Sequence, residues 1–241
     1  MLLGVKTLTI GHLEVKVQPT SAENLRSMTV GQFSEIKLIQ RTLERSVRSG
    51  DVVADVGAHT GLWSIPLAMT VGPGGAVYAF EPEPATYSAL QRNIELNSLG
   101  NVTSFPIALS DRTGAATLNV RGDTELHSFY ETTVEPFDNA RRETIAVTVD
   151  RLDLMLGKKN LVPPTFMKID VEGAELEVLK GAEGIIRSLR TILVEVHEEP
   201  LRAQGLGICD ITGFLEAHDF SEAAGAGDAT HLVYRRSTPT L

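Results

Sequence analysis

The chain has 241 residues, 42% of them hydrophobic, with 22 Lys plus Arg against 31 Asp plus Glu and a formal net charge of −9. This composition is typical of a folded globular protein, and the acidic balance disfavours general binding to nucleic-acid phosphates or anionic membranes, since both need a basic face. The single cysteine excludes an intrachain disulfide and any site built from several thiolates. No segment predicts a secretory signal or a membrane-spanning helix, so we expect a cytoplasmic protein.

Short β-rich runs alternate with amphipathic helical segments, which is the pattern of a parallel sheet covered by helices. We expect strands at 52–56, 76–80, 101–109, 115–120, 144–149, 165–169, 191–196 and 231–235, and helices at 62–69, from Pro84 onward, and at 151–156, 173–189 and 209–218. We interpret 46–241 as one α/β domain with an insertion at 112–149. Residues 1–45 are expected to add a strand pair and a helix packed on the edge of the sheet.

A glycine-containing turn, Asp55-Val-Gly-Ala-His-Thr-Gly61, lies directly between a predicted strand and a predicted helix. Ligands of open parallel sheets bind at such strand ends. Gly57 allows a tight turn and a close approach of a ligand, and Gly61 lets the start of the helix come near. Glu81 ends the next predicted strand, 24 residues after Gly57, where a carboxylate can bind the two hydroxyls of a ribose. Together the two features predict a site for an adenosine-containing cofactor.

His59 decides between two such cofactors. The dinucleotide fingerprint has a glycine at this position, which lets the backbone approach a pyrophosphate, and an imidazole would crowd that group. S-adenosylmethionine has no pyrophosphate, and its amino-acid end, sulfonium and ribose match Asp55, the turn and Glu81 in order. Two alternatives stay open, namely an NAD(P)-dependent oxidoreductase on the same fold and a cofactor-binding protein without catalytic activity.

Four motifs in consistent order resemble the FkbM family of S-adenosylmethionine-dependent methyltransferases. They are residues 51–61, Ala79-Phe-Glu-Pro82, Ala108-Leu-Ser-Asp111 and Lys168-Ile-Asp-Val-Glu-Gly-Ala-Glu175. The resemblance implies a Rossmann-like class I methyltransferase fold, a mostly parallel seven-stranded sheet with helices on both faces and an antiparallel last strand. It also implies transfer of methyl to a hydroxyl oxygen. His59 departs from the family, which usually has asparagine there.

The resemblance also implies how the cofactor is held. Asp55 and Gly57 would lie near the methionine end and Glu81 on the ribose. Ile107 and Ala108 would border the adenine. The full set of expected cofactor contacts is Asp55, Gly57, Ala58, His59, Thr60, Gly61, Glu81, Pro82, Ile107, Ala108 and Asp170. We expect His59 to contact the cofactor through its backbone.

The first candidates for catalysis follow the predicted strand at 165–169. A hydroxyl is a poor nucleophile near neutral pH, so a base is expected beside the methyl group. Asp170 and Glu172 suit that role, although they could instead cap the next helix and complement its positive end. Lys168 in a buried strand needs a carboxylate partner or becomes a perturbed base, and we favour the pair.

Glu195 and His197 end the next predicted strand with both side chains on one face. His197 has a suitable unperturbed pKa for a catalytic base. Alternatively, these two residues join Asp170 and Glu172 in holding a divalent cation that orients the acceptor, although we expect no metal requirement. A solvated acidic strand end is the third interpretation.

Other segments have plainer interpretations. The N-terminal arm and the insertion, with 122–128 and Phe129-Tyr130, are expected to cover the acceptor. Cys209 is expected in a small buried apolar place, and Trp63 is expected to pack its helix on the sheet. The histidines expected to be structural or exposed are His12, His127, His218 and His231.

The sequence therefore predicts a cytoplasmic S-adenosylmethionine-dependent O-methyltransferase. Its acceptor is expected to be a hydroxyl of a small molecule, a natural product or a sugar. Neither a nucleic acid nor a membrane is expected as a partner. A nitrogen acceptor and a homodimer stay open.

Overall fold

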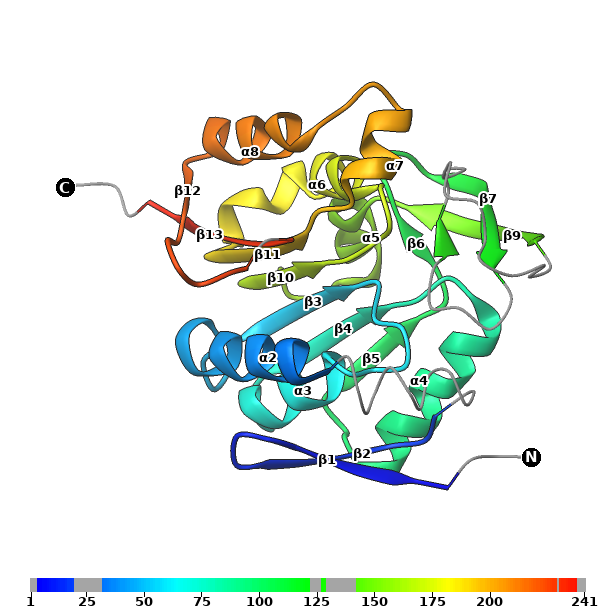
Figure 1. Cartoon of the computed structure of the whole chain (residues 1–241), viewed down its shortest axis with the longest axis vertical. Helices are drawn as coiled ribbons and strands as arrows, with labels where there is room; N and C mark the ends of the chain where they lie inside the picture. The colour runs from blue at the N-terminus through cyan, green and yellow to red at the C-terminus, as the bar shows by residue number, and fades with distance from the viewer. Residues whose placement is uncertain (1–3, 20–31, 122–126, 129–141, 229, 238–241) are drawn as a thin grey trace.

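The computed structural model describes residues 4–19, 32–121, 127–128, 142–228 and 230–237. Its central sheet has seven strands in the order β12-β13-β11-β10-β3-β4-β5 (Figure 1). The parallel strands are β11 (Thr191–Glu195), β10 (Phe166–Ile169), β3 (Val52–Val56), β4 (Ala76–Phe80) and β5 (Val102–Phe105). The last strand, β13 (His231–Arg236), runs antiparallel between β11 and β12 (Phe220–Glu222). The mostly parallel seven-stranded sheet that the sequence implied is confirmed.

The central strands are apolar because helices bury both faces of the sheet. Every residue of β10 is buried, and so are the last four residues of β3. Two ionisable side chains interrupt this pattern, Asp55 in β3 and Lys168 in β10. The register of the two strands pairs these positions. A buried acid and a buried base therefore lie side by side in the middle of the sheet.

Helices cover both faces of the sheet. Their bounds are Gln32–Ser46 (α2), Ser64–Val71 (α3), Pro84–Leu96 (α4), Leu152–Lys159 (α5), Glu175–Gly181 (α6), Glu198–Ala203 (α7) and Ile208–Ala217 (α8). Apolar side chains of α2 and α3 pack with Val53 and Val77 on one face. Those of α5, α6 and α8 pack with Ala54 and Val56 on the other. Across the described residues, none of the helices combines the length and apolar character needed to span a bilayer.

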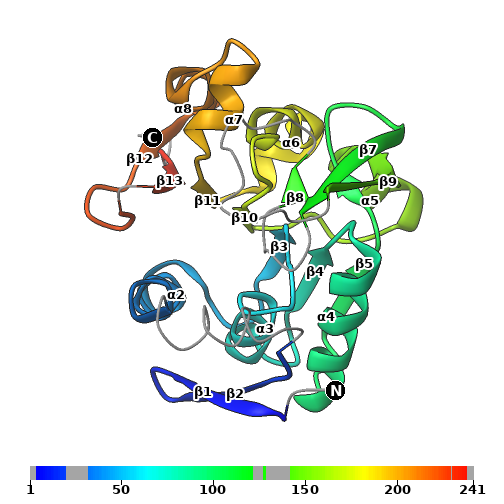
Figure 2. The ribbon, with the colours of Figure 1, turned by 45° about the vertical axis from the view of Figure 1, so that its right-hand side comes forward.

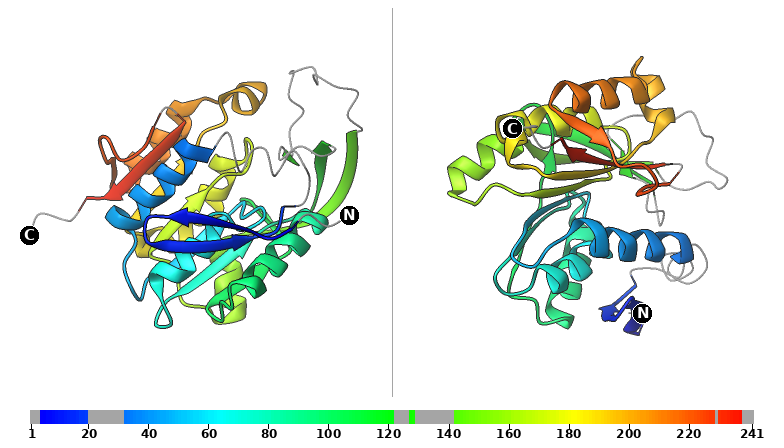
Figure 3. Two further views of the ribbon diagram at one scale, coloured as in Figure 1. Left: turned by 60° about the horizontal axis from the view of Figure 1, so that its bottom comes forward. Right: turned by 90° about the vertical axis from the view of Figure 1, so that its left-hand side faces the viewer.

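The N-terminal segment forms the expected strand pair and helix, but not at the edge of the sheet. β1 (Lys6–Ile10) and β2 (Leu13–Val17) form a hairpin that lies beside α3 and α4 (Figure 3). Asn97, at the end of α4, bonds both the N–H and the C=O of Lys16. α2 lies over a face of the sheet because its buried side chains, such as Leu38, need an apolar surface. The expected edge position is wrong.

A second sheet lies between β5 and α5 in the chain and stands beside α5 and α6 in Figure 2. Its strands, in the order β6-β9-β7-β8, are β6 (Ala108–Leu109), β9 (Arg142–Asp150), β7 (Gly114–Arg121) and β8 (His127–Ser128). The expected strands at 115–120 and 144–149 are the central parts of β7 and β9. Residues 122–126 and 129–141, which include most of the predicted acceptor contacts, lie outside the described residues.

The predicted helix at 173–189 is in fact two elements. α6 ends at Gly181, and a 3₁₀ helix, η2 (Glu183–Ser188), follows it. A Cβ at Gly181 would come within 2.0 Å of the carbonyl oxygen of Ser110. The helix therefore packs directly against the backbone that follows β6, and the chain changes helix type at this close approach.

The burial of two side chains, Trp63 and Cys209, was predicted from the sequence, and the structure confirms only the first. Trp63 is buried and packs in one core with α3 and β3, as expected. Cys209 is exposed near the start of α8, contrary to expectation. The buried face of α8 is formed by Ile211 and Leu215, which leaves Cys209 outside the core.

Candidate active site

The carboxyl ends of four neighbouring strands define the candidate active site (Figure 2). Glu81 follows β4, Asp55 and Gly57 lie at the end of β3, Asp170 follows β10 and His197 follows β11. Ligands of open α/β sheets bind outside the carboxyl ends of the strands. The fold thus brings the predicted cofactor residues and the predicted catalytic residues to one edge of the sheet.

Lys168 connects the ends of β3 and β10. Its Nζ lies 2.9 Å from the carbonyl oxygen of Gly57, 3.1 Å from Asp170 Oδ2 and 3.6 Å from Asp55 Oδ1. Burial disfavours the charged ammonium, but the carboxylates of Asp170 and Asp55 outweigh it and raise the pKa of Lys168 above its ordinary value. Lys168 is therefore suited to the ion-pair role rather than to that of a base.

The two carboxylates beside Lys168 differ in their environments. Burial raises the pKa of Asp55, although Lys168 and Ser64 act in the other direction. Ser64, in α3, donates a 2.5 Å hydrogen bond to Asp55 Oδ2. Burial also acts on Asp170, but there Lys168 and His197 prevail and lower the pKa. The closer carboxylate, Asp170, is thus the main ionic partner of Lys168.

The turn after β3 is tied to the strands on both sides. Gly57 has a φ of 76°, and a Cβ there would lie 1.7 Å from the carbonyl oxygen of Asp170. The backbone N–H groups of Gly57 and Ala58 donate to the carbonyl of Phe80 at the end of β4. His59 has a φ of 49° and donates its backbone N–H to Glu81 Oε2 over 3.0 Å. The backbone N–H of His59 thus bonds a residue outside the turn, the one that follows β4.

Glu81 is a carboxylate enclosed by the turn and by the start of α4, with only 4% of its surface exposed. Its two oxygens accept hydrogen bonds from the backbone N–H groups of His59 and Glu83, at 3.0 and 2.9 Å. Burial raises the pKa of Glu81 to about 7 in spite of these bonds. Hydrogen bonds from further hydroxyl donors would favour the ionised form of Glu81 and lower its pKa.

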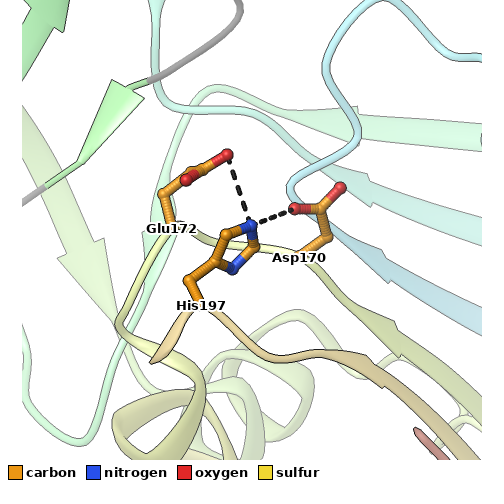
Figure 4. A group of neighbouring side chains, drawn as sticks. All are labelled: Asp170, Glu172 and His197. Carbon is orange, nitrogen blue, oxygen red and sulfur yellow. Dashed lines mark ion pairs between the residues drawn. The ribbon is translucent and has the colours of Figure 1, made fainter. Parts of the chain in front are cut away.

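His197 faces three carboxylates, two of which, Asp170 and Glu172, are drawn in Figure 4. Its Nδ1 lies 2.7 Å from Glu175 Oε1, and its Nε2 lies 3.4 Å from Glu172 Oε1 and 3.8 Å from Asp170 Oδ1. Burial lowers the pKa of an imidazole, but Glu175, and after it Glu172 and Asp170, outweigh that effect and raise the pKa of His197 to about 9. Burial in turn raises the pKa of Glu172 to about 7. The four side chains form one electrostatic unit.

Glu175 is the member of this unit that the sequence did not single out. It is fully buried in the first turn of α6, and its Oε1 also accepts the backbone N–H of Gly173 over 2.9 Å. The N-cap of α6 is Ala174, so Asp170 does not cap this helix. The charge in the first helical turn comes from Glu175 and Glu177 rather than from Glu172.

A second imidazole lies at the next strand. His231 pairs with Glu195 across β11 and β13, with its Nε2 3.0 Å from Glu195 Oε2 and its Nδ1 2.9 Å from Asp228 Oδ1. These two ion pairs agree with the structural role expected of His231. By contrast, His218 lies apart, where its ring bonds the carbonyl of Phe214.

The other predicted cofactor residues lie around the same strand ends. Thr60 is buried, and its carbonyl accepts a 2.8 Å hydrogen bond from Asn93, a contact that the sequence did not suggest. Gly61 has a φ of 95° and leads into α3. The remaining positions, beside Glu81 and at the start of the second sheet, are Pro82, Ile107 and Ala108.

Comparison with solved structures identifies the class of fold. The chain matches the crystal structure of magnesium protoporphyrin IX methyltransferase from Synechocystis PCC 6803 with bound SAH, with a TM-score of 0.52 and 15% sequence identity. The match covers 90% of this chain and 89% of that one. The fold is thus that of the class I methyltransferases that use S-adenosylmethionine.

Comparison of sequences identifies the family. Residues 55–225 match the model of the methyltransferase FkbM domain, and the chain belongs to that family of methyltransferase enzymes. The chain is 29% identical over 223 residues to the 31-O-demethyl-FK506 methyltransferase FkbM of Streptomyces tacrolimicus, covering 80% of this chain and 83% of that protein. It is 31% identical over 145 residues to Methyltransferase 1 of Beauveria bassiana, covering 54% of this chain and 58% of that protein. The resemblance drawn from the four motifs is confirmed.

The substitution Glu81→Gln removes a carboxyl group whose pKa the fold raises from 4.5 to about 7. The folded protein holds this proton more tightly than the unfolded chain does. The contribution of Glu81 to the free energy of unfolding therefore falls as the pH rises from 4.5 to about 7, and it is constant above that. Relative to Glu81→Gln, the ligand-free wild type should lose on the order of 2–3 kcal/mol between about pH 5 and pH 8.

Urea unfolding of both proteins across this pH range measures the effect. The comparison cancels the contribution of Glu172 and other groups that both proteins share. Stability curves that run parallel for the two proteins would contradict the raised pKa.

Proposed function

We propose that this chain transfers the methyl group of S-adenosylmethionine to a hydroxyl oxygen of a small organic molecule. One observation carries the proposal: two unlike clusters stand at one edge of the sheet, a buried carboxylate beside a glycine-containing turn and a carboxylate–imidazole unit on the adjacent strands. The first suits a ribose, and the second suits a hydroxyl that must lose its proton. The name of the Streptomyces relative, 31-O-demethyl-FK506 methyltransferase, supports an oxygen acceptor on a natural product.

The residues around the turn fit S-adenosylmethionine, which supplies a methyl group on a positively charged sulfur when it is bound. Two backbone N–H groups hold Glu81, and the remaining lone pairs of its carboxylate are available to ribose hydroxyls. Asp55 is fully buried behind the turn, and its Oδ1 lies 3.6 Å from the ammonium of Lys168. The acidic character of both groups suits a cation and would repel a pyrophosphate.

The same arrangement supports a set of cofactor contacts. The backbone of the turn would line the amino-acid end and the ribose, and Asp170 would stand between cofactor and acceptor. The further members of this set are Gly57, Ala58, His59, Thr60, Gly61, Pro82, Ile107 and Ala108. His59 occupies the position of the dinucleotide-binding glycine, and its imidazole would crowd a pyrophosphate, which argues against an NAD(P)-dependent oxidoreductase.

Residues of this chain would align the acceptor and take its proton. Lys168 fixes one oxygen of Asp170, and Glu175 fixes Nδ1 of His197, so that Nε2 faces the two carboxylates of the unit. Such fixed side chains hold a hydroxyl within reach of the methyl group without reorganisation. We assign Asp170, Glu172 and His197 to the acceptor hydroxyl, with Lys168 as the group that positions Asp170.

The proposal also includes the class of acceptor, the domain organisation and the cellular location of the enzyme. The net charge of −9 supports a small-molecule acceptor rather than a nucleic acid. We propose that residues 1–45 and the insertion at 112–149 belong to the same domain as the sheet. A cytoplasmic location agrees with a reaction that uses a cytosolic cofactor.

Calorimetric titration of the purified chain tests the cofactor assignment without knowledge of the acceptor. S-adenosylmethionine should bind, and NAD should not. Glu81→Ala should weaken binding about tenfold or more, since it removes the acceptor of the ribose hydroxyls. Glu44→Ala, an exposed carboxylate on α2, is the control and should bind like the wild type. Binding of NAD without binding of S-adenosylmethionine would overturn the proposed function.

Transfer of labelled methyl to a panel of hydroxyl compounds tests the catalytic assignment. His197→Ala should lower kcat by about 100-fold or more, because the acceptor hydroxyl loses the side chain that aligns it with the methyl group. The dissociation constant of S-adenosylmethionine should change less than about threefold, since His197 stands beyond the cofactor turn. His218→Ala is the matched control and should retain full turnover. A His197→Ala enzyme with the kcat of the wild type would remove His197 from the mechanism.

A further inference from the structure

The carboxylate–imidazole unit has the geometry of a cation site (Figure 4). Asp170, Glu172 and His197 each offer one ligand atom, and these atoms lie within 4.8 Å of one another. His197 Nε2 is 3.4 Å from Glu172 Oε1 and 3.8 Å from Asp170 Oδ1. Atoms that share one metal ion stand at separations of about this size when each bond is about 2.0–2.2 Å long. We propose that this unit binds a divalent cation that receives the acceptor hydroxyl, an inference that rests on the proposed function.

The contact on the far side of the imidazole is an independent sign of a ligating histidine. A metal-bound histidine almost always gives its other ring nitrogen to a carboxylate or a carbonyl, which fixes the tautomer and the orientation of the ring. Here Glu175 Oε1 lies 2.7 Å from His197 Nδ1. Glu175 is itself fully buried and held by the backbone N–H of Gly173. The lone pair of Nε2 is thereby directed toward Asp170 and Glu172.

The two oxygens of Asp170 have separate partners. Oδ2 lies 3.1 Å from the ammonium of Lys168, and Oδ1 is the oxygen that faces His197. Lys168 therefore neutralises part of the charge of Asp170 without occupying the ligand atom. A cation beside Oδ1 adds positive charge to a unit that otherwise gathers three carboxylates around one imidazole.

The site is open on one side. The side chains of His197, Asp170 and Glu172 are 17%, 29% and 22% exposed, so solvent reaches all three. Three protein ligands with a free position are the arrangement of catalytic metal sites, whereas structural sites are closed. A cation in this position would lower the pKa of the acceptor hydroxyl, and the released proton would pass to solvent.

The ligand chemistry selects the kind of cation. Two carboxylates and one imidazole suit first-row divalent ions such as Mn²⁺. Ca²⁺ is disfavoured, because it takes six to eight oxygen ligands. Elsewhere in the described residues, no other group of three such side chains brings its ligand atoms this close. One Mn²⁺ per chain is therefore the expected stoichiometry.

Mn²⁺ titration followed by electron paramagnetic resonance tests the site on the full chain after chelator treatment, since the free-ion signal disappears on binding. The wild type should bind one Mn²⁺. His197→Ala and Glu172→Gln should each weaken binding tenfold or more, and Glu175→Gln should weaken it about tenfold through the orientation of the imidazole. His218→Ala and Glu183→Gln, an ion pair outside the site, are the controls and should bind like the wild type.

The outcomes of this experiment distinguish a failure of the proposed cation site from a failure of the proposed methyl transfer. The absence of a bound Mn²⁺ in the wild type, or binding of Mn²⁺ by Glu172→Gln and His197→Ala with the affinity of the wild type, overturns the cation site. If the chelated enzyme then still binds S-adenosylmethionine and transfers methyl, the proposed function stands and His197 acts on the acceptor directly. If S-adenosylmethionine fails to bind with or without Mn²⁺, the proposed function fails. Thermal melting of each variant without Mn²⁺ verifies that it is folded.

Discussion

The ammonium of Lys168 is the group on which the rest of the site depends. It is buried in the middle strand pair of the sheet, and a charge in that environment is tolerated only when it is paired and hydrogen-bonded. Its three oxygen partners come from Gly57, Asp170 and Asp55. One side chain thus joins the turn after β3 to the carboxyl end of β10.

The contact with Lys168 also explains why the carboxyl groups at this edge of the sheet differ in pKa. Asp170 has its pKa lowered by Lys168, whereas burial raises the pKa of Glu81 and of Glu172 to about 7. A carboxyl group whose ionised form is favoured suits a fixed charge, and one near neutrality responds to a ligand. Part of the acidic excess of the chain therefore lies at one edge of the sheet, in environments that shift the pKa of each carboxyl group differently.

Local sequence patterns were sufficient for most strands of the central sheet and for the turn between β3 and α3. The run of apolar residues before Gly57, and Glu81 at the end of the next strand, predicted the strands, the turn and their order. The conformation of His59 also agrees with the pattern, because its φ of 49° lies in the left-handed region that asparagine, the usual residue of the family, tolerates well.

The catalytic half depends on contacts between distant parts of the chain. Glu175 meets His197 across 22 residues, and His231 reaches Glu195 only because β13 returns antiparallel beside β11. No periodicity or spacing signals such pairs. The division of the predicted helix at 173–189 has the same origin, since it follows from the close packing of Gly181 on Ser110.

The substitution Lys168→Met tests most directly whether the two halves depend on one buried charge. The account predicts a loss of about 3–5 kcal/mol in the free energy of unfolding, because Asp55 remains buried without its partner, together with a tenfold or greater loss of affinity for S-adenosylmethionine. Lys158→Met, which removes an exposed ion pair with Asp150, should change either quantity little. A Lys168→Met protein that unfolds and binds S-adenosylmethionine like the wild type would contradict the account.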